Sequence, residues 1–232
     1  MATNLVVRNI EPSVAQALRE AAARHGRLYA VDGPAGRLVR HYESITVKIL
    51  AVSDVELPQL LNAELLRRTY SDVDLLVSCG DMRASYLDFI GSVLNLPLFF
   101  VRGNHDSRPE LPDPGGDNLH LRIKRLRGFS FAGLEGSIRY NKGAVQFTEG
   151  EMLVNVLRLL PRMLVMRSQQ GYGVDVMVAH SPPRDIHDIP DDFAHHGFQA
   201  FRYLINWGRP RFFLHGHVDL SLIHISEPTR PY

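Results

Sequence analysis

Short runs of apolar and β-branched residues, most of them followed directly by a polar motif, constrain this chain's fold more than any other feature. The runs cover residues 46–52, 73–79, 97–101, 129–132, 174–179 and 211–214. Their lengths and residue types are those of β-strands. Strands whose sequence is apolar almost throughout are covered on both faces. The chain is therefore predicted to build buried sheets rather than sheets with one side in water.

Helical patterns lie between these runs, at residues 58–69, 83–95, 149–167 and 197–207. Strands that alternate with helices are typical of α/β folds. The chain has 232 residues, of which 45% are hydrophobic, so it can bury a sizeable core. This length fits one large domain, or one domain with an appendage.

Metal-ligating residue types follow five of the six strands. They are Asp54, Asp81, Asn104 with His105, His180 and His217. Ligands of α/β proteins bind beyond the carboxyl ends of the strands, so these side chains are expected to converge at one edge of the fold. Mixed oxygen and nitrogen ligands suit manganese, iron, zinc or similar divalent ions better than calcium.

Such a cluster predicts phosphoester chemistry. A shared carboxylate can bridge two metal ions roughly 3.5–4 Å apart, and the pair lowers the pKa of a bridging water and holds the phosphoryl oxygens. We find no Ser-His-Asp arrangement and no phosphate-cradling glycine loop in the sequence that would favour another mechanism.

Over about residues 45–219, the motifs resemble those of the calcineurin-like metallophosphoesterases, whose pattern is D-x-H, GD, GNH(D/E), H and GHxH. The resemblance implies an α/β fold with two packed β-sheets flanked by helices, a four-layer sandwich that is C-terminally truncated in this chain. It implies a hydrolase that cleaves a phosphorylated small molecule or a phosphodiester through a metal-activated water.

The resemblance also assigns roles to individual residues. Asp81 would bridge both metal ions and Asp54 would bind the first. The second ion would be bound by Asn104, His180 and His217. His105 would assist by stabilising the transition state or protonating the leaving oxygen, with Asp106 near enough to orient it.

Two positions depart from the family pattern. Glu56 and Asp219 stand where the family has histidines that bind the first metal ion. Two carboxylates would favour magnesium or manganese over zinc at that position, or leave it weakly filled. We therefore expect two divalent ions (Mn, Fe, Zn or Mg), the first weakly held, with a catalytically inactive binding protein as the alternative.

The two ends of the chain differ from this domain, which is expected to span residues 44–219. Residues 1–43 are predicted to be an appended strand and helix, whose first 25 residues or so resemble ribbon-helix-helix antitoxins. A DNA-binding module is thus a second hypothesis, although the second helix of that family is not recognisable. Residues 220–232 resemble a translated sequencing adapter and are interpreted as an artefactual tail that replaces the natural C-terminus.

Charge and composition bound the possible partners. The 26 Lys and Arg nearly balance the 25 Asp and Glu, so net charge makes no case for nucleic acid or an anionic membrane. A local basic cluster at Arg122, Lys124, Arg125 and Arg127 fits either a patch or a solvated edge strand. A single cysteine, Cys79, and the lack of a membrane-length apolar run predict a cytoplasmic protein without membrane association.

Overall fold

The computed structural model describes residues 4–8, 46–106, 113–218 and 224–226, with only the backbone described for the first and last of these ranges. The described strands are β1 (Asn4–Arg8), β2 (Thr46–Val52), β3 (Leu75–Ser78), β4 (Leu98–Phe100), β5 (Asp117–Asn118), β6 (Ile123–Leu126), β7 (Phe129–Leu134), β8 (Ser137–Ile138), β9 (Gln146–Phe147), β10 (Val176–Ala179), β11 (Phe212–His215) and β12 (His224–Ser226). The α-helices are α2 (Ala63–Tyr70), α3 (Ala84–Leu94), α4 (Glu149–Gln170) and α5 (Gln199–Gly208), and the 3₁₀ turns are η1 (Pro58–Leu61) and η2 (Phe193–His195).

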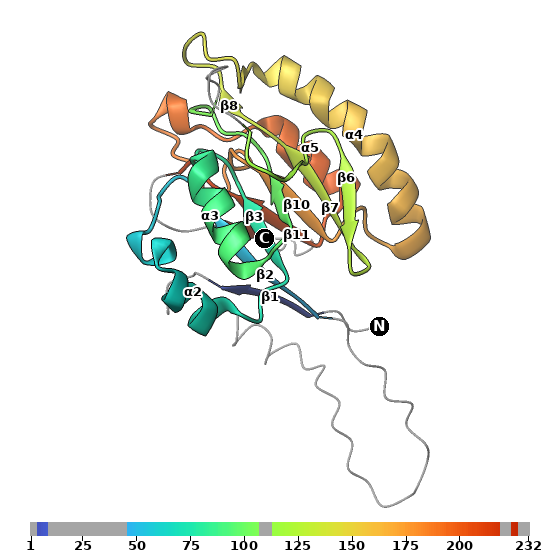
Figure 1. The fold of residues 1–232 in the computed structure, drawn as a ribbon. Coiled ribbons are helices and arrows are strands. Elements are labelled where there is room, and N and C mark those ends of the chain that lie inside the picture. The colour runs from blue at the N-terminus through green and yellow to red at the C-terminus, as the bar shows by residue number, and fades with distance from the viewer. Residues whose placement is uncertain (1–3, 9–45, 107–112, 219–223, 227–232) are drawn as a thin grey trace, which may run out of the picture.

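Two five-stranded sheets form the centre of the protein. The first has the order β1-β2-β3-β4-β5 and its strands are parallel. The second has the order β12-β11-β10-β7-β6, with a parallel centre and an antiparallel strand at each edge. Helices cover the outer face of each sheet, α2 and α3 on one side and α4 and α5 on the other (Figure 1). The predicted α/β sandwich is confirmed.

The alternation of side chains along each strand explains why both sheet faces are apolar. In β2, Ile49 and Ala51 point into the core between the sheets, whereas Leu50 and Val52 pack under α2 and α3. In β10, Val176 and Val178 enter the same inter-sheet core, and Met177 packs under α4 and α5. Successive strand side chains face opposite sides, so a sheet with helices on one face and a sheet on the other needs apolar residues at every position.

Helix boundaries follow local capping chemistry. Thr148 and Glu151 form a reciprocal capping box at the start of α4, and Gly171 in a left-handed conformation ends it. The helix expected over 58–69 is instead divided at Asn62. This residue is extended, and its side chain accepts a hydrogen bond from the Leu65 amide, so a 3₁₀ turn ends there and α2 begins.

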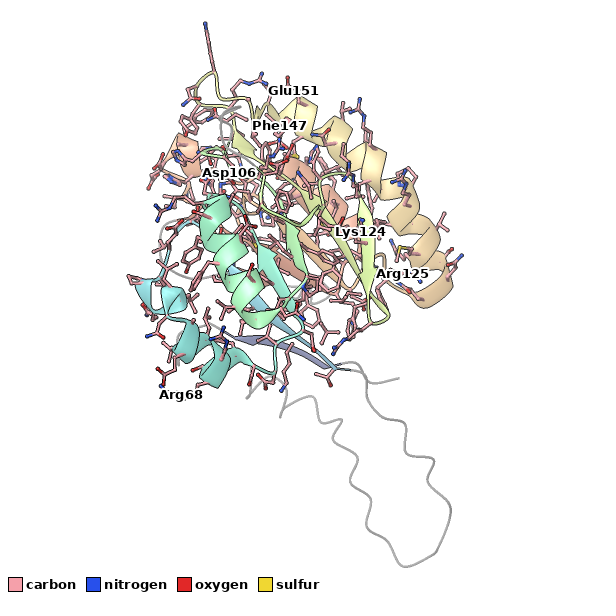
Figure 2. The ribbon with its side chains drawn as sticks, in the orientation of Figure 1. Arg68, Asp106, Lys124, Arg125, Phe147 and Glu151 are labelled. Carbon is pink, nitrogen blue, oxygen red and sulfur yellow. The ribbon has the colours of Figure 1, made fainter. Side chains whose placement is uncertain are left out.

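The edges of the sheets bear on the remaining sequence predictions. β1 pairs with β2, and β12 pairs with β11. Neither pairing tests whether the phosphoesterase-like domain begins at residue 44 and ends at residue 219, as the sequence predicts. The cationic side chains Lys124 and Arg125 project from β6, an edge strand (Figure 2). Charged residues on an edge oppose pairing with another chain, which favours the edge-strand interpretation. Among the described helices, none has the length and apolar sequence needed to cross a bilayer.

Candidate metal centre

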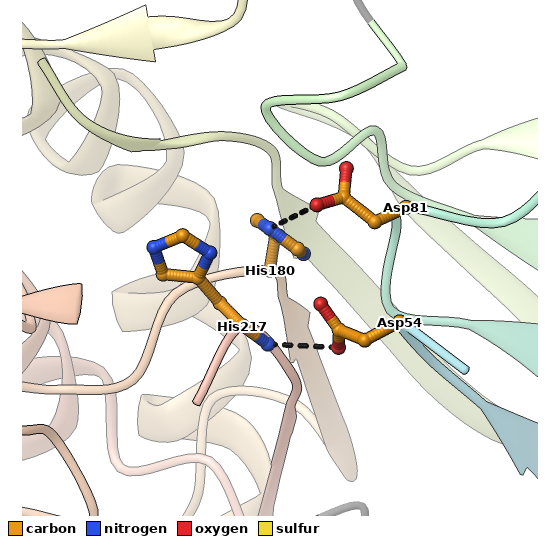
Figure 3. Close-up of side chains that lie close together, drawn as sticks. All are labelled: Asp54, Asp81, His180 and His217. Carbon is orange, nitrogen blue, oxygen red and sulfur yellow. Dashed lines mark hydrogen bonds and ion pairs between the residues drawn. The ribbon is translucent and has the colours of Figure 1, made fainter. Parts of the chain in front are cut away.

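Side chains from the ends of both sheets meet at one point. Asp54 follows β2 and Asp81 follows β3 in the first sheet, while His180 follows β10 and His217 follows β11 in the second. One ligand atom from each of these four residues lies within 4.8 Å of all the others (Figure 3). The convergence expected beyond the strand ends is present. Two carboxylates and two imidazoles at this spacing fit a divalent transition-metal ion.

Three of these four residues have left-handed backbone conformations. The φ angles are 60° at Asp54, 56° at Asp81 and 68° at His217. Non-glycine residues rarely adopt this region, and each instance costs of order 1–3 kcal/mol. The fold therefore holds these three residues in backbone conformations that cost free energy, which is typical of functional sites.

Two glycines permit the close approach of the motifs. A Cβ atom at Gly103 would collide with the Asp81 carboxylate and lie 2.7 Å from Cε1 of His180. A Cβ atom at Gly216 would collide with Ser53 and the Asp54 carboxylate. Both positions therefore need a residue without a side chain.

His180 is fully buried and held on both ring nitrogens. Its Nδ1 lies 2.8 Å from the Cys79 carbonyl oxygen, and its Nε2 lies 2.9 Å from Oδ1 of Asn104 and 3.3 Å from Oδ2 of Asp81. Burial by itself would lower the pKa of His180, but the Asp81 charge and hydrogen bond outweigh it and raise the pKa to about 9. Burial likewise opposes ionisation of Asp81, yet the charge of His180 holds the pKa of Asp81 below its usual value.

A metal ion would occupy the position of the proton that His180 Nε2 shares with Asp81 and Asn104 in the absence of metal. Nε2 of His180 is shared by Asp81 and Asn104, so three potential ligand atoms already point at one position. Metal ions bind neutral imidazole and ionised carboxylate, so binding releases such a proton. The residues present therefore fit a metal ion.

His217 is held by a backbone contact that the sequence did not reveal. Its Nε2 lies 2.8 Å from the carbonyl oxygen of Ala194, in η2. A carbonyl accepts only, so Nε2 carries the hydrogen and Nδ1 is left as the metal-facing nitrogen. Burial, reinforced by the neighbouring charge of His180, lowers the pKa of His217 to about 3.

Asn104 is oriented from its other end as well. Its Nδ2 donates to the hydroxyl of Tyr140 at 2.9 Å, while Oδ1 faces His180. Tyr140 follows β8 and lies 36 residues away in sequence, and no motif pointed to it. Amide and phenol together set which atom of Asn104 faces the metal position.

His105 and Asp106 lie on the turn that follows β4. The amide of His105 donates to Oδ1 of Asp81 at 2.8 Å, and its side chain is exposed at the site. Oδ2 of Asp106 accepts from the amides of Asp81 and Gly103, at 2.7 and 2.9 Å. Burial, more than these bonds, governs the pKa of Asp106 and raises it. Asp106 thus joins two motif turns, and its expected role in orienting the His105 ring remains a prediction.

The two departures from the motif pattern lie apart from the group of four. Glu56 forms an ion pair with Arg83, whose Nε lies 2.8 Å and 2.9 Å from the two carboxylate oxygens. The hydrogen bonds from Arg83 lower the pKa of Glu56. Asp219 lies outside the described residues. The structure therefore places Glu56 with a cation of the protein, and among the described residues Glu56 joins no metal group with Asp54.

A cavity of about 550 Å³ is lined in part by residues that are sequence neighbours of those contacting the metal ligands. Its lining includes Ile138, Arg139, Arg184 and Phe193. Arg139 directly precedes Tyr140, which contacts Asn104, and Phe193 directly precedes Ala194, which contacts His217. Two walls of the cavity are thus continuous with residues that position metal ligands.

His195, from the polar loop that follows the His180 motif, also reaches this region. Its ring centroid lies 5.0 Å from that of His217, and its Nδ1 lies 2.6 Å from Asp192. The polar sequence of residues 187–196 favours surface exposure, and its position after the His180 motif is the one sequence signal for a place near the centre.

Comparison with known proteins agrees with this geometry. The family model for calcineurin-like phosphoesterases matches residues 47–220. No curated protein shows a significant match. One solved structure aligns with 96% of this chain and 88% of its own length at 14% identity, with a TM-score of 0.40, too low to support an argument.

Proposed function

Because the chain belongs to the calcineurin-like phosphoesterase family, we propose that it hydrolyses phosphoester bonds with divalent metal ions bound at the centre described above. The observation that carries the proposal is the meeting of Asp54, Asp81, His180 and His217, from the ends of two sheets, within 4.8 Å. When bound, such ions lower the pKa of a coordinated water and neutralise phosphoryl oxygens.

The chain's own residues divide the remaining work. Asp81, Asn104, His180 and His217 would hold one ion, and Asp54 with Asp81 a second, more weakly held one. Asp81 also fixes the backbone of His105 through a 2.8 Å hydrogen bond. His105, exposed beside the centre, would donate a proton to the leaving oxygen or stabilise charge on the phosphoryl group.

The cavity described above is where we place the organic part of the substrate. Ile138 and Phe193 line it with apolar side chains. Arg184 also lines it, and its Nε donates a hydrogen bond to the carbonyl oxygen of Gly197. Replacing Phe193 with Ala should raise KM several-fold while leaving kcat nearly unchanged, because the ring contacts the leaving group rather than the reacting atoms. A fall in kcat with KM unchanged would contradict this placement.

A direct assay tests the activity. The full chain is purified with Mn²⁺ and supplied with a chromogenic phosphodiester and a chromogenic phosphomonoester. EDTA should abolish hydrolysis, and His105→Ala should lower kcat by about 10²–10⁴-fold. Arg68→Ala is the control, because Arg68 is exposed on α2 and takes part in none of the contacts described above for the metal centre or the cavity. Hydrolysis that survives both chelation and His105→Ala would rule the mechanism out.

The Glu56–Arg83 ion pair favours a second candidate, an inactive relative that binds metal or a phosphorylated ligand. With Glu56 paired, the first ion has fewer ligands among the described residues. The two candidates differ in one measurement: the inactive form would bind Mn²⁺ and inorganic phosphate in calorimetry but give no product with either chromogenic substrate.

A further inference from the structure

The outer face of α4 is apolar, although it points away from the core. Val154, Leu157, Leu164 and Val165 recur at helical spacing and are 41–57% exposed. The buried positions of the same helix, among them Met152, Val156 and Met163, lie on its opposite side. Periodic burial of one stripe accounts for a surface helix, but not for a second apolar stripe in water.

The adjoining helix α5 extends this surface. α4 and α5 pack side by side, and Nη1 of Arg167 on α4 donates to the Trp207 carbonyl on α5 at 2.7 Å (Figure 1). Tyr203 and Trp207 stack on each other with ring centroids 5.5 Å apart, and Trp207 is 49% exposed. Of the ten large hydrophobic residues that are exposed in the described part of the chain, six thus belong to these two helices. We call this set (Val154, Leu157, Leu164, Val165, Tyr203 and Trp207) the α4–α5 surface.

Arginines border the α4–α5 surface along most of its length. The acidic residues of α4, Glu149 and Glu151, lie in its first turn and are bonded to the Ala200 amide and to Arg139. Arg202 and Arg211 on the α5 side pair with Asp185 and Asp175. From Met152 to Gln170 the sequence has three Arg and no Asp or Glu, and the same is true of residues 199–211. Arg158 and Arg162 are exposed and make no ion pair within the described part of the chain.

We propose that the α4–α5 surface docks on an anionic lipid bilayer, lying in its interface without crossing it. Helices with Leu and Trp on one face and Arg beside it bind in this way, by burying apolar side chains while the arginines meet acidic headgroups. A second copy of the chain is a poorer occupant. A two-fold axis would bring Arg158 and Arg162 of both copies together, and the acidic residues of α4, Glu149 and Glu151, are already bonded to Ala200 and Arg139 of their own chain.

The test is flotation of the full chain with vesicles, and it does not depend on catalytic activity. Vesicles of phosphatidylcholine containing about one third phosphatidylserine should retain the protein, and pure phosphatidylcholine should retain little of it. The double variant R158Q/R162Q should partition about 30-fold more weakly, from roughly one factor of five for each arginine near the surface. The variant L157Q/L164Q should weaken partition as well, because it removes apolar burial.

The matched control is R67Q/R68Q, which neutralises two exposed arginines on α2, at the opposite layer of the sandwich. It should retain wild-type partition, and far-UV circular dichroism should show all three variants folded. Equal partition of R158Q/R162Q and R67Q/R68Q would overturn the proposal. So would wild-type retention on L157Q/L164Q, which would indicate charge attraction alone, or a lipid-free dimer in light scattering that L157Q/L164Q dissociates.

Discussion

The backbone amide of His217 donates a 2.9 Å hydrogen bond to Oδ2 of Asp54, which joins residues 163 positions apart in the chain. This contact links the first and last motifs and the two sheets at the metal centre (Figure 3). The same Asp54 carboxylate is one of the groups that would bind a cation. Metal binding and the closure of the two sheets are therefore coupled.

This coupling predicts that metal ions stabilise the fold. Mn²⁺ at about 100 times its dissociation constant should add about 2.7 kcal/mol to the free energy of unfolding, since the unfolded chain lacks the site. The melting temperature should rise with Mn²⁺ and fall again with EDTA. Asp81→Asn should suppress most of the rise, whereas Asp88→Asn should not, because Asp88 is an exposed residue of α3 outside the metal group. A Mn²⁺-independent melting temperature in the wild type would contradict the site.

Asp106 should contribute to the stability of the fold, besides being the neighbour of His105. Its Oδ2 accepts from the amides of Asp81 and Gly103. Asp106→Ala leaves two amides without acceptors, each costing about 1–3 kcal/mol, whereas Asp106→Asn keeps an oxygen and should cost less. Urea denaturation of both variants checks the order. Equal stability of the two would show that the amides find other partners.

Gly103→Ala should disrupt the centre. Its Cβ would collide with the Asp81 carboxylate, so either that carboxylate moves or the turn does. We expect Mn²⁺ affinity in calorimetry to fall by tenfold or more, as for changes beside metal ligands. Gly150→Ala on α4 is the control, because nothing lies within 4 Å of its added Cβ and alanine suits helices better. Unchanged affinity in Gly103→Ala would show that the turn accommodates a methyl group.

Stability should fall in mild acid through His120. Burial, aided by nearby arginines, lowers the pKa of His120 from 6.5 to about 4, so the unfolded chain binds the proton more readily. The contribution is complete above about pH 6.5 and is lost as pH falls towards 4. Between pH 7.5 and 4.5 it amounts to roughly 2 kcal/mol. The wild-type stability should drop over this range by more than that of His120→Gln, as followed by urea midpoints; parallel curves would exclude His120 as the cause.

Local sequence was enough to predict the layers and the positions of the motifs. Strand runs such as 46–52 are apolar at nearly every position, which indicates burial on both faces of the sheet. The motif residues follow the ends of these strands, where ligands of α/β proteins bind. The helix over 58–69 was wrong in one respect, because Asn62 offers its own side chain to the backbone and divides the segment. Asn62 is visible in the sequence, but an asparagine can either continue a helix or cap a new one, and only the structure shows that it caps α2.

Tertiary structure alone decided what each side chain touches. Glu56 pairs with Arg83, Nε2 of His217 bonds the Ala194 carbonyl, and Nδ2 of Asn104 bonds the Tyr140 hydroxyl. In each pair the partners lie 23 to 36 residues apart, so they meet only when the loops pack. It also decided that Leu157 faces outward, since periodicity shows that a helix has apolar stripes but not which stripe the sheet covers. The sequence by itself determined the fold class and the order of the strand-end motifs, while long-range packing determined the finished metal centre and the outer surface.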